Sequence, residues 1–202
     1  MEGVEESMTD LSVAACTRCP ELVESRSQIV NGVGPADAPL LIVGEAPGAE
    51  EDKLGEPFVG RSGDLLTDKL AAVGIERDTV RITNCVRCRP PENRDPSTDE
   101  RTRCLKWLTR EIRLVDPDLI LAVGKVPAEN LLDRHVAVTA EAGSIERVSI
   151  GEDLHRVVIS VHPAAMLYNR SLEDTLDNTL GMVARELGIY SARDEQKRLE
   201  EF

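Results

Sequence analysis

Short apolar runs alternate along the chain with longer segments in which apolar residues recur every three or four positions. The runs at residues 40–43, 80–83, 119–123 and 157–161 are rich in Val, Ile and Leu, a composition typical of buried strands. The longer segments predict helices, whose apolar faces are formed by Leu65, Leu66, Leu70 and Val73, by Leu105, Leu108, Ile112 and Val115, and by Leu176, Leu180, Val183 and Leu187. The alternation predicts an α/β fold, a three-layer α/β/α sandwich with a central, mainly parallel four-stranded sheet.

A hairpin and a disordered terminus complete this plan. The turn sequence Gly151-Glu152-Asp153, between residues 145–150 and the fourth run, predicts a short hairpin. Residues 1–10 lack apolar periodicity and are predicted to be disordered. With 202 residues, of which 41% are hydrophobic, the chain can bury one core, so residues 11–202 are predicted to form a single domain.

Polar or glycine-rich sequences follow all four predicted strands. The first strand runs into residues 44–48, Gly-Glu-Ala-Pro-Gly, and the second runs into Asn84. The third is followed by Gly124, and the fourth by His162 and a proline. Open parallel sheets bind their ligands at the carboxyl ends of their strands. We therefore expect these residues to lie around one crevice.

The net charge of the chain argues against nucleic-acid binding, but one segment is locally positive. The net charge is −13, whereas proteins that bind nucleic acids usually present basic surface to the phosphates. Between Arg81 and Arg113, however, nine Arg and Lys residues against five Asp and Glu give a local charge of about +4. The acidic excess at the two ends, and the preference for Arg over Lys, resemble the composition of proteins from salt-loving microbes.

Targeting and membrane signals are missing from the sequence pattern. The longest apolar runs fall far short of the roughly 20 residues that span a bilayer. The first residues carry Glu2, Glu5 and Glu6 instead of the basic and apolar regions of a secretory signal. These features predict a cytoplasmic protein with no membrane partner, and we expect a monomer.

Five cysteines in such a protein indicate metal ligation, because thiols stay reduced inside cells. Cys16 and Cys19 form a C-x-x-C pair, which can supply two ligands to one metal centre. Cys85 lies next to a buried strand and is expected to be a buried thiol, whereas Cys88 opens an irregular segment. The predicted ligands are thus Cys16, Cys19, Cys88 and Cys104. Their spacing does not distinguish zinc from an iron–sulfur cluster, and unligated thiols are a third alternative.

Five motifs, in order, resemble the uracil-DNA glycosylase superfamily, and the last two look like its family 4, the iron–sulfur type. They are Gly-Glu-Ala-Pro-Gly at 44–48, Glu-Glu-Asp at 50–52, Pro-Phe-Val-Gly-Arg-Ser-Gly at 57–63, Thr-Asn-Cys-Val-Arg-Cys-Arg-Pro-Pro-Glu-Asn-Arg at 83–94 and His-Pro-Ala-Ala at 162–165. The resemblance covers about residues 16–187. It implies a [4Fe-4S] cluster on Cys16, Cys19, Cys88 and Cys104, and leaves Cys85 without a ligand role.

The resemblance also implies an activity and a base pocket. A uracil flipped out of DNA would stack on Phe58 and be read by the amide of Asn84, and His162 would donate a hydrogen bond to the departing base. The backbone of Gly44, Glu45 and Ala46 would approach the base closely.

Water activation and stabilisation of the cationic sugar suit a carboxylate, for which Glu45 and Glu51 are the candidates without a choice between them. Asn93 would shape the nearby loop, and Arg170 would either contact DNA or lie on the surface as an ordinary arginine. No lysine lies in the strand-end motifs. The expected reaction is therefore hydrolysis alone, which leaves an abasic site.

Two other functions fit parts of the sequence. A zinc-stabilised module that binds nucleic acid without catalysis would use the same cysteines. An enzyme acting on free nucleotides would cradle phosphate with residues 44–48, but this loop lacks the Gly-Lys-Ser/Thr ending of a phosphate loop and precedes an acidic run.

Overall fold

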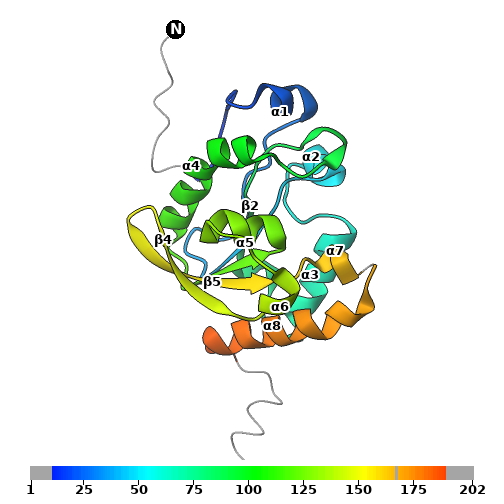
Figure 1. Ribbon diagram of the computed structural model, residues 1–202, viewed down its shortest axis with the longest axis vertical. Coiled ribbons are helices and arrows are strands. Elements are labelled where there is room, and N and C mark those ends of the chain that lie inside the picture. The colour runs from blue at the N-terminus through cyan, green and yellow to red at the C-terminus, as the bar shows by residue number, and fades with distance from the viewer. Residues whose placement is uncertain (1–10, 167, 190–202) are drawn as a thin grey trace, which may run out of the picture.

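The computed structural model describes residues 11–166 and 168–189 (Figure 1). Residues 1–10, predicted to be disordered, lie outside the described residues. The strands are β1 (Leu40–Gly44), β2 (Arg81–Asn84), β3 (Leu119–Val123), β4 (Ile145–Ile150) and β5 (Asp153–Ser160). The α-helices are α1 (Pro20–Ser25), α2 (Ala49–Leu54), α3 (Arg61–Ala72), α4 (Thr98–Val115), α5 (Lys125–Leu132), α6 (Val138–Glu141), α7 (Pro163–Met166) and α8 (Glu173–Glu186). Three short 3-10 helices are η1 (Arg77–Thr79), η2 (Pro91–Asn93) and η3 (Arg170–Leu172).

The strands form one sheet in the order β2-β1-β3-β5-β4, in which only β4 runs antiparallel to its neighbour. The predicted α/β class and hairpin are confirmed, but the predicted number of four strands is one too few. The fifth strand, β4, pairs along its whole length with β5 at the edge of the sheet. Its residues are mostly half-buried or exposed, as in Glu146 and Ser149. It therefore lacks the apolar run by which the other strands are recognised.

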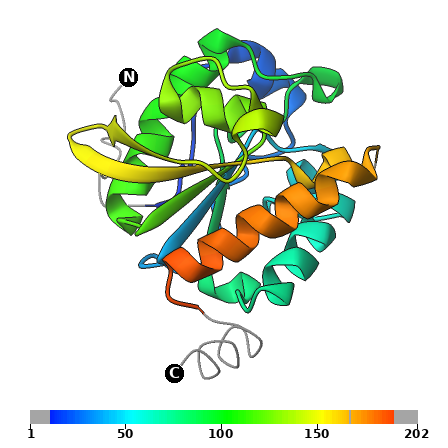
Figure 2. The same ribbon diagram turned by 60° about the horizontal axis from the view of Figure 1, so that its bottom comes forward.

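The two faces of the sheet are covered by different helices (Figure 2). Successive side chains of a strand point to opposite faces. Leu40 and Ile42 pack in one core with residues of α3 and α8, whereas Leu41 and Val43 pack in the other with residues of α4 and α5. The three predicted amphipathic helices correspond to α3, α4 and α8. Each is longer than the segment between the first and last of the apolar residues from which it was predicted.

A third, smaller core lies beyond the sheet, at the end where Figure 1 shows α1 and α2. Val13, Leu22, Val86 and Trp107 are buried there with two cysteines. Within the described ranges, no helix is long and apolar enough to cross a membrane.

Helix α4 joins this small core to the sheet, and its start is fixed by a capping box. Ser97 Oγ accepts from the backbone amide of Glu100, and the Glu100 carboxylate accepts from the amide of Ser97 at 2.7 Å. Arg94 donates to both carboxylate oxygens of Glu100. This fixed start places Cys104 and Trp107 on the buried face of the helix.

Candidate active site and cysteine cluster

The candidate pocket begins where β1 and β2 end. Gly44 and Asn84 are partners in the parallel register of these strands. A Cβ atom added to Gly44 would lie 2.3 Å from Asn84 Oδ1 and 2.5 Å from Phe58 Cε2. Since such contacts are too short for any side chain, only glycine permits this arrangement. The Asn84 amide and the Phe58 ring therefore flank bare backbone.

Asn84 carries a donor that the protein itself does not use. The residue is 3% exposed, and its Nδ2 has no hydrogen-bond partner among the residues that the structure describes. Leaving a buried donor unpaired costs about 1–3 kcal/mol. Such a donor is suited to a ligand that presents a carbonyl oxygen.

Phe58 and His162 stack on each other beside Asn84. Their ring centroids are 5.7 Å apart and their planes meet at 24°. Phe58 lies in the loop between α2 and α3, whereas His162 is the second residue after β5. The backbone of Phe58 is left-handed, with φ of 52°, a conformation that costs a non-glycine residue about 1–3 kcal/mol. Surrounding contacts must therefore hold Phe58 in place.

His162 is held as a neutral imidazole with a defined tautomer. Its Nδ1 accepts a hydrogen bond from the backbone amide of Ala164 at 3.1 Å, which places the ring proton on Nε2. Burial lowers the pKa of His162 to about 4. At neutral pH the ring thus offers an uncharged Nε2–H donor.

Glu51 acts on the loop that carries Phe58. Its Oε2 accepts from the amide of Gly48 at 2.5 Å, and its Oε1 accepts from the amide of Phe58. Burial raises the pKa of Glu51, while these two amides and the nearby Arg77 guanidinium act in the opposite direction. Both carboxylate oxygens are occupied by backbone donors, so Glu51 is a structural brace of the loop.

Glu45 is the second candidate carboxylate, and its side chain lies in a different environment, beside Asp95 and Arg101. Burial and the neighbouring Asp95, which is also its hydrogen-bond partner, raise the pKa of Glu45 to about 7, against the opposing charge of Arg101. No backbone amide contributes to this shift. Of the two candidate carboxylates, Glu45 is therefore the one not committed to bracing a loop.

The remaining predicted pocket residues have other surroundings. Ala46 packs against the small cysteine-containing core. Asn93 Oδ1 accepts from Arg89 Nε at 2.8 Å, inside the loop that follows β2. Arg170 is exposed at the start of η3 and faces the charge of Glu173.

The four predicted ligand cysteines line one pocket, although they come from three separate segments. Cys88 and Cys104 are buried, and Cys16 and Cys19 are half-buried. Cys85 belongs instead to the core between the sheet and α4. Within the described part of the chain, no group of three or more His, Cys, Asp or Glu side chains is arranged to hold a single metal ion.

Burial favours the protonated form of three of these thiols, those of Cys19, Cys88 and Cys104. Burial raises the pKa of Cys104 to about 12, and it also raises the pKa of Cys19 and Cys88, to which repulsion from Cys16 adds. The opposing influence on Cys88 is Arg26, whose Nη1 donates to Cys88 Sγ at 2.8 Å and whose Nη2 donates to the Cys16 carbonyl at 2.7 Å. Arg26 thus ties two of the cysteine-bearing segments together.

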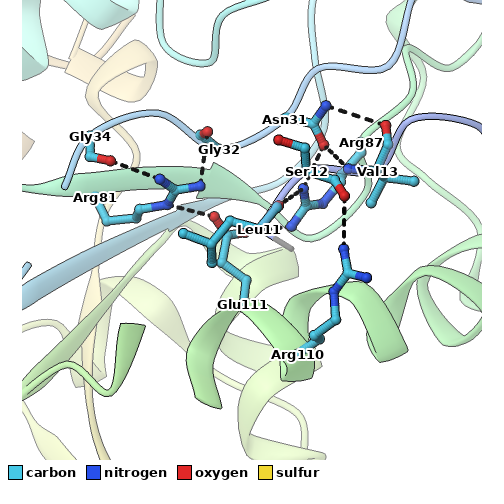
Figure 3. Close-up of polar contacts among 10 residues, drawn as sticks. All are labelled: Leu11, Ser12, Val13, Asn31, Gly32, Gly34, Arg81, Arg87, Arg110 and Glu111. Carbon is cyan, nitrogen blue, oxygen red and sulfur yellow. Dashed lines mark hydrogen bonds and ion pairs between the residues drawn. The ribbon is translucent and has the colours of Figure 1, made fainter. Parts of the chain in front are cut away.

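A buried carboxylate holds the sheet against the chain that leads to the cysteines (Figure 3). Glu111, on α4, accepts from Arg81 Nε at 2.7 Å and from Arg87 Nη2 at 2.5 Å, and all three side chains are buried. Arg81 also donates to the carbonyls of Gly34, at 2.7 Å, and Gly32, at 3.0 Å. One carboxylate therefore pairs with two buried guanidinium groups, which also hold the loop before β1.

The same network reaches the segment that precedes Cys16 (Figure 3). Asn31 Oδ1 accepts from Arg87 Nη1 and from the amide of Val13, both at 2.8 Å. Arg110 Nη2 donates to the Ser12 carbonyl at 3.0 Å. Residues 11–13 are thereby fixed by polar contacts to the loop before β1, the loop after β2 and α4.

This network corrects the sequence-based interpretation of local charge. The segment 81–113 was predicted to offer positive charge to phosphate, yet Arg81, Arg87 and Arg110 are only 6%, 2% and 5% exposed. Their guanidinium groups serve internal carboxylates and carbonyls because the chain folds them beneath the surface. Counting charges along the chain therefore overestimates the basic surface.

Sequence reasoning missed the residues that support the predicted ones. Arg26, Glu111, Arg77 and Asp95 belong to no recognised motif, and each acts on residues far away in the sequence. The one sequence signal for internal ion pairs is the high density of arginine around β2 and α4.

Comparisons of the sequence with known proteins identify its family. The family profile of the uracil DNA glycosylase superfamily matches residues 31–182. The chain is 35% identical over 189 residues to the type-4 uracil-DNA glycosylase of Archaeoglobus fulgidus, covering 91% of this chain and 94% of that protein. It is 41% identical over 172 residues to the type-4 uracil-DNA glycosylase of Thermotoga maritima, covering 84% and 88%. Identity to the type-5 uracil-DNA glycosylase of Pyrobaculum aerophilum is lower, 30% over 205 residues. The chain belongs to the uracil-DNA glycosylase superfamily, and within it to the type-4 proteins.

Proposed function

We propose that this protein flips uracil out of DNA and hydrolyses the N-glycosidic bond between uracil and deoxyribose, leaving an abasic site. The observation that carries the proposal is the convergence of Phe58, Asn84 and a neutral His162 at one edge of the sheet. An aromatic platform, an amide and an uncharged donor are the groups that binding and releasing uracil require.

Binding is assigned to Phe58 and Asn84. Stacking on an aromatic ring is worth about 1–3 kcal/mol per base. The unpartnered Asn84 Nδ2 would donate to O4 of uracil, and its Oδ1 would accept from N3–H. Cytosine presents an amino group and an unprotonated N3 at these positions, so the same amide orientation disfavours it.

Departure of the base is assigned to His162. Uracil leaves with negative charge, and a donor aimed at its carbonyl oxygen lowers the barrier. The Ala164 amide fixes the His162 proton on Nε2, so the ring donates without first changing its protonation state.

The water and the cationic sugar are assigned to Glu45, because Glu51 uses both carboxylate oxygens on the backbone. A carboxylate near the sugar can orient water and stabilise positive charge. Gly44, Glu45 and Ala46 provide the backbone that lines the base. Arg170 is proposed to contact phosphate, since it is exposed one short turn beyond α7.

The cysteine pocket is proposed to hold a [4Fe-4S] cluster through Cys16, Cys19, Cys88 and Cys104. Four thiols around one pocket are a donor set suited to iron–sulfur ligation. When bound, the cluster would supply a covalent link between the N-terminal segment, the loop after β2 and helix α4. Iron, sulfide and zinc analysis of anaerobically purified protein tests this assignment, and stoichiometric zinc without sulfide would replace it with a structural zinc site.

The activity is tested with single- and double-stranded oligonucleotides that contain one uracil, followed by alkaline cleavage of abasic sites. Salt should be varied, because phosphate contacts weaken as salt rises. We expect cleavage at the uracil and no cleavage of matched cytosine or thymine strands. No product at any salt concentration would refute the proposal. Full activity in both Asn84→Ala and His162→Ala would refute the assignment of the pocket.

A further inference from the structure

Phe58 is held from both sides of its backbone by charged side chains. The Glu51 carboxylate accepts from its amide, and the Arg77 guanidinium donates from Nη2 to its carbonyl at 3.0 Å. The same Nη2 donates to the Pro57 carbonyl at 3.0 Å. The left-handed backbone of Phe58 makes such contacts necessary, since an aromatic residue does not favour this conformation on its own.

Arg77 is itself fixed by α3. Its Nη1 donates to Thr67 Oγ1 at 3.1 Å, and Thr67 Oγ1 donates in turn to the Gly63 carbonyl at 2.8 Å. Gly63 must be glycine, because an added Cβ would lie 1.8 Å from the Phe58 carbonyl oxygen. The helix thus packs directly against the carbonyl that Arg77 binds.

From this geometry we propose that Arg77 is a positioning residue for the base platform, which acts on the reaction through Phe58 without touching the substrate. The planar guanidinium spans two successive carbonyls and a hydroxyl, a geometry that lysine cannot reproduce. Arg77 also lies near the carboxylates of Glu51, Glu56 and Asp64, which keep its charge balanced in this partly buried position. The proposal rests on the proposed base-stacking role of Phe58, but the position of its ring can be measured separately.

The chain offers a direct probe of that position, because it contains two phenylalanines, Phe58 and Phe202. Iron-loaded full-length protein labelled with 4-fluorophenylalanine should give two ¹⁹F signals, and Phe202→Leu assigns them. We expect Arg77→Gln to shift or broaden the Phe58 signal and Arg77→Lys to do so less. Arg185→Gln, at an exposed position on α8, should leave the signal unchanged.

Activity supplies the second measurement. A displacement of about 1 Å caused away from the chemistry can cost about 100-fold in rate. We expect Arg77→Gln to lower the single-turnover rate on uracil-containing DNA by about this factor, with Arg77→Lys between it and the wild type. In a Phe58→Leu background, the additional loss caused by Arg77→Gln should fall to about threefold or less, since the platform on which Arg77 acts is already absent.

The outcomes separate this proposal from the proposed function. A full loss from Arg77→Gln in the Phe58→Leu background, or an unchanged Phe58 signal in both Arg77 variants, would overturn the positioning role. If Arg77→Gln does not fold, Arg77→Lys must still shift the Phe58 signal and lower the rate. Wild-type protein that leaves uracil-containing DNA intact would refute the glycosylase function, while the ¹⁹F result would still decide whether Arg77 holds Phe58.

Discussion

The base pocket and the cysteine-bearing end of the molecule differ in where their charged side chains lie. In the pocket, the side chains that would face the base are uncharged: the Phe58 ring, the Asn84 amide and the neutral His162. At the cysteine-bearing end, charged side chains hold the chain, as in the contacts of the buried Glu111 and the half-buried Arg26.

The sizes of the hydrophobic cores explain this difference. Among the described residues, the core around the cysteines contains six buried apolar residues, whereas the cores on the two sheet faces contain 18 and 14. A core of six residues contributes little burial free energy, so ion pairs, together with the proposed cluster ligation, would supply the rest. The pocket rests on the large cores and can keep an unpaired donor and a strained backbone. Changes at the two regions should therefore affect different measurements.

The largest effect on stability is expected from Glu111→Gln. This change leaves Arg81 and Arg87 buried without a carboxylate, and breaking a buried ion pair typically costs about 3–5 kcal/mol. For a chain of this size the thermal midpoint should fall by roughly 6–20 °C. The midpoint of the iron-loaded protein is measured by circular dichroism at constant heating rate.

The matched control for this change is Glu186→Gln. Glu186 pairs with Arg156 on the surface, where an ion pair is worth under about 1 kcal/mol. Equal midpoints for the two variants would contradict the view that buried charge holds the cysteine-bearing end. Below its lowered midpoint, Glu111→Gln should keep its activity on uracil-containing DNA.

The opposite pattern is expected for His162→Ala. Removing one donor aimed at a developing negative charge lowers a rate by about 100- to 1000-fold, or about 2.7–4 kcal/mol. The thermal midpoint should change far less than in Glu111→Gln, because His162 lies at the edge of the large core. Single-turnover kinetics measure the loss, and the exposed His135→Ala is the control. A rate within threefold of the wild type would remove His162 from the mechanism.

The contrast also shows which features can be predicted from the sequence. The central strands are recognisable because both faces of the sheet are covered, which makes their apolar runs continuous. Strand β4 is not recognisable in this way, because most of its residues are half-buried or exposed and it has no continuous apolar run. Phe58, Asn84 and His162 stand within local motifs at strand ends or glycine-rich loops. The rule for parallel sheets predicted that Asn84 and His162 lie around one crevice, whereas the role of Phe58 followed from the resemblance to the family.

The supporting charges could not be predicted in the same way. Glu111 reads as an ordinary polar position of an amphipathic helix, and its two arginine partners lie 24 and 30 residues earlier. Arg77 reaches the Phe58 carbonyl across 19 residues of chain. Such contacts depend on tertiary packing, which neither periodicity nor spacing encodes. For the same reason, the positive charge of residues 81–113 was assigned to the surface although part of it is buried.

A smaller effect is expected at the cysteine pocket from Arg26→Gln. The change removes the hydrogen bonds to Cys88 Sγ and to the Cys16 carbonyl. Loss of a residue that contacts metal ligands from outside typically weakens metal binding by about 10- to 100-fold. If the pocket holds the proposed cluster, we expect its visible absorbance to be lost faster when chelator is added anaerobically, with Arg185→Gln as control. Identical rates of loss would show that Arg26 holds only the backbone.

The smallest effect is expected on the pH dependence of the rate. It tests whether Glu45 is the group whose carboxylate form the reaction requires. Burial and Asp95 raise the pKa of Glu45 to about 7, so its carboxylate is lost as the pH falls through 7 and activity should fall with it. Protonation of His162, with a pKa of about 4, contributes only at much lower pH. Asp95→Asn removes a charge that disfavours the carboxylate, which lowers the pKa of Glu45. The single-turnover rate should therefore rise about two- to fivefold at pH 6 and stay unchanged at pH 8.

Two control variants accompany this change. Asp99→Asn, at an exposed position, should keep the wild-type pH profile. Glu45→Gln should lose most of the rate, and its remaining rate should no longer fall at acidic pH. A profile unaltered by Asp95→Asn would mean that another group titrates near neutral pH, and the water would then need a different carboxylate.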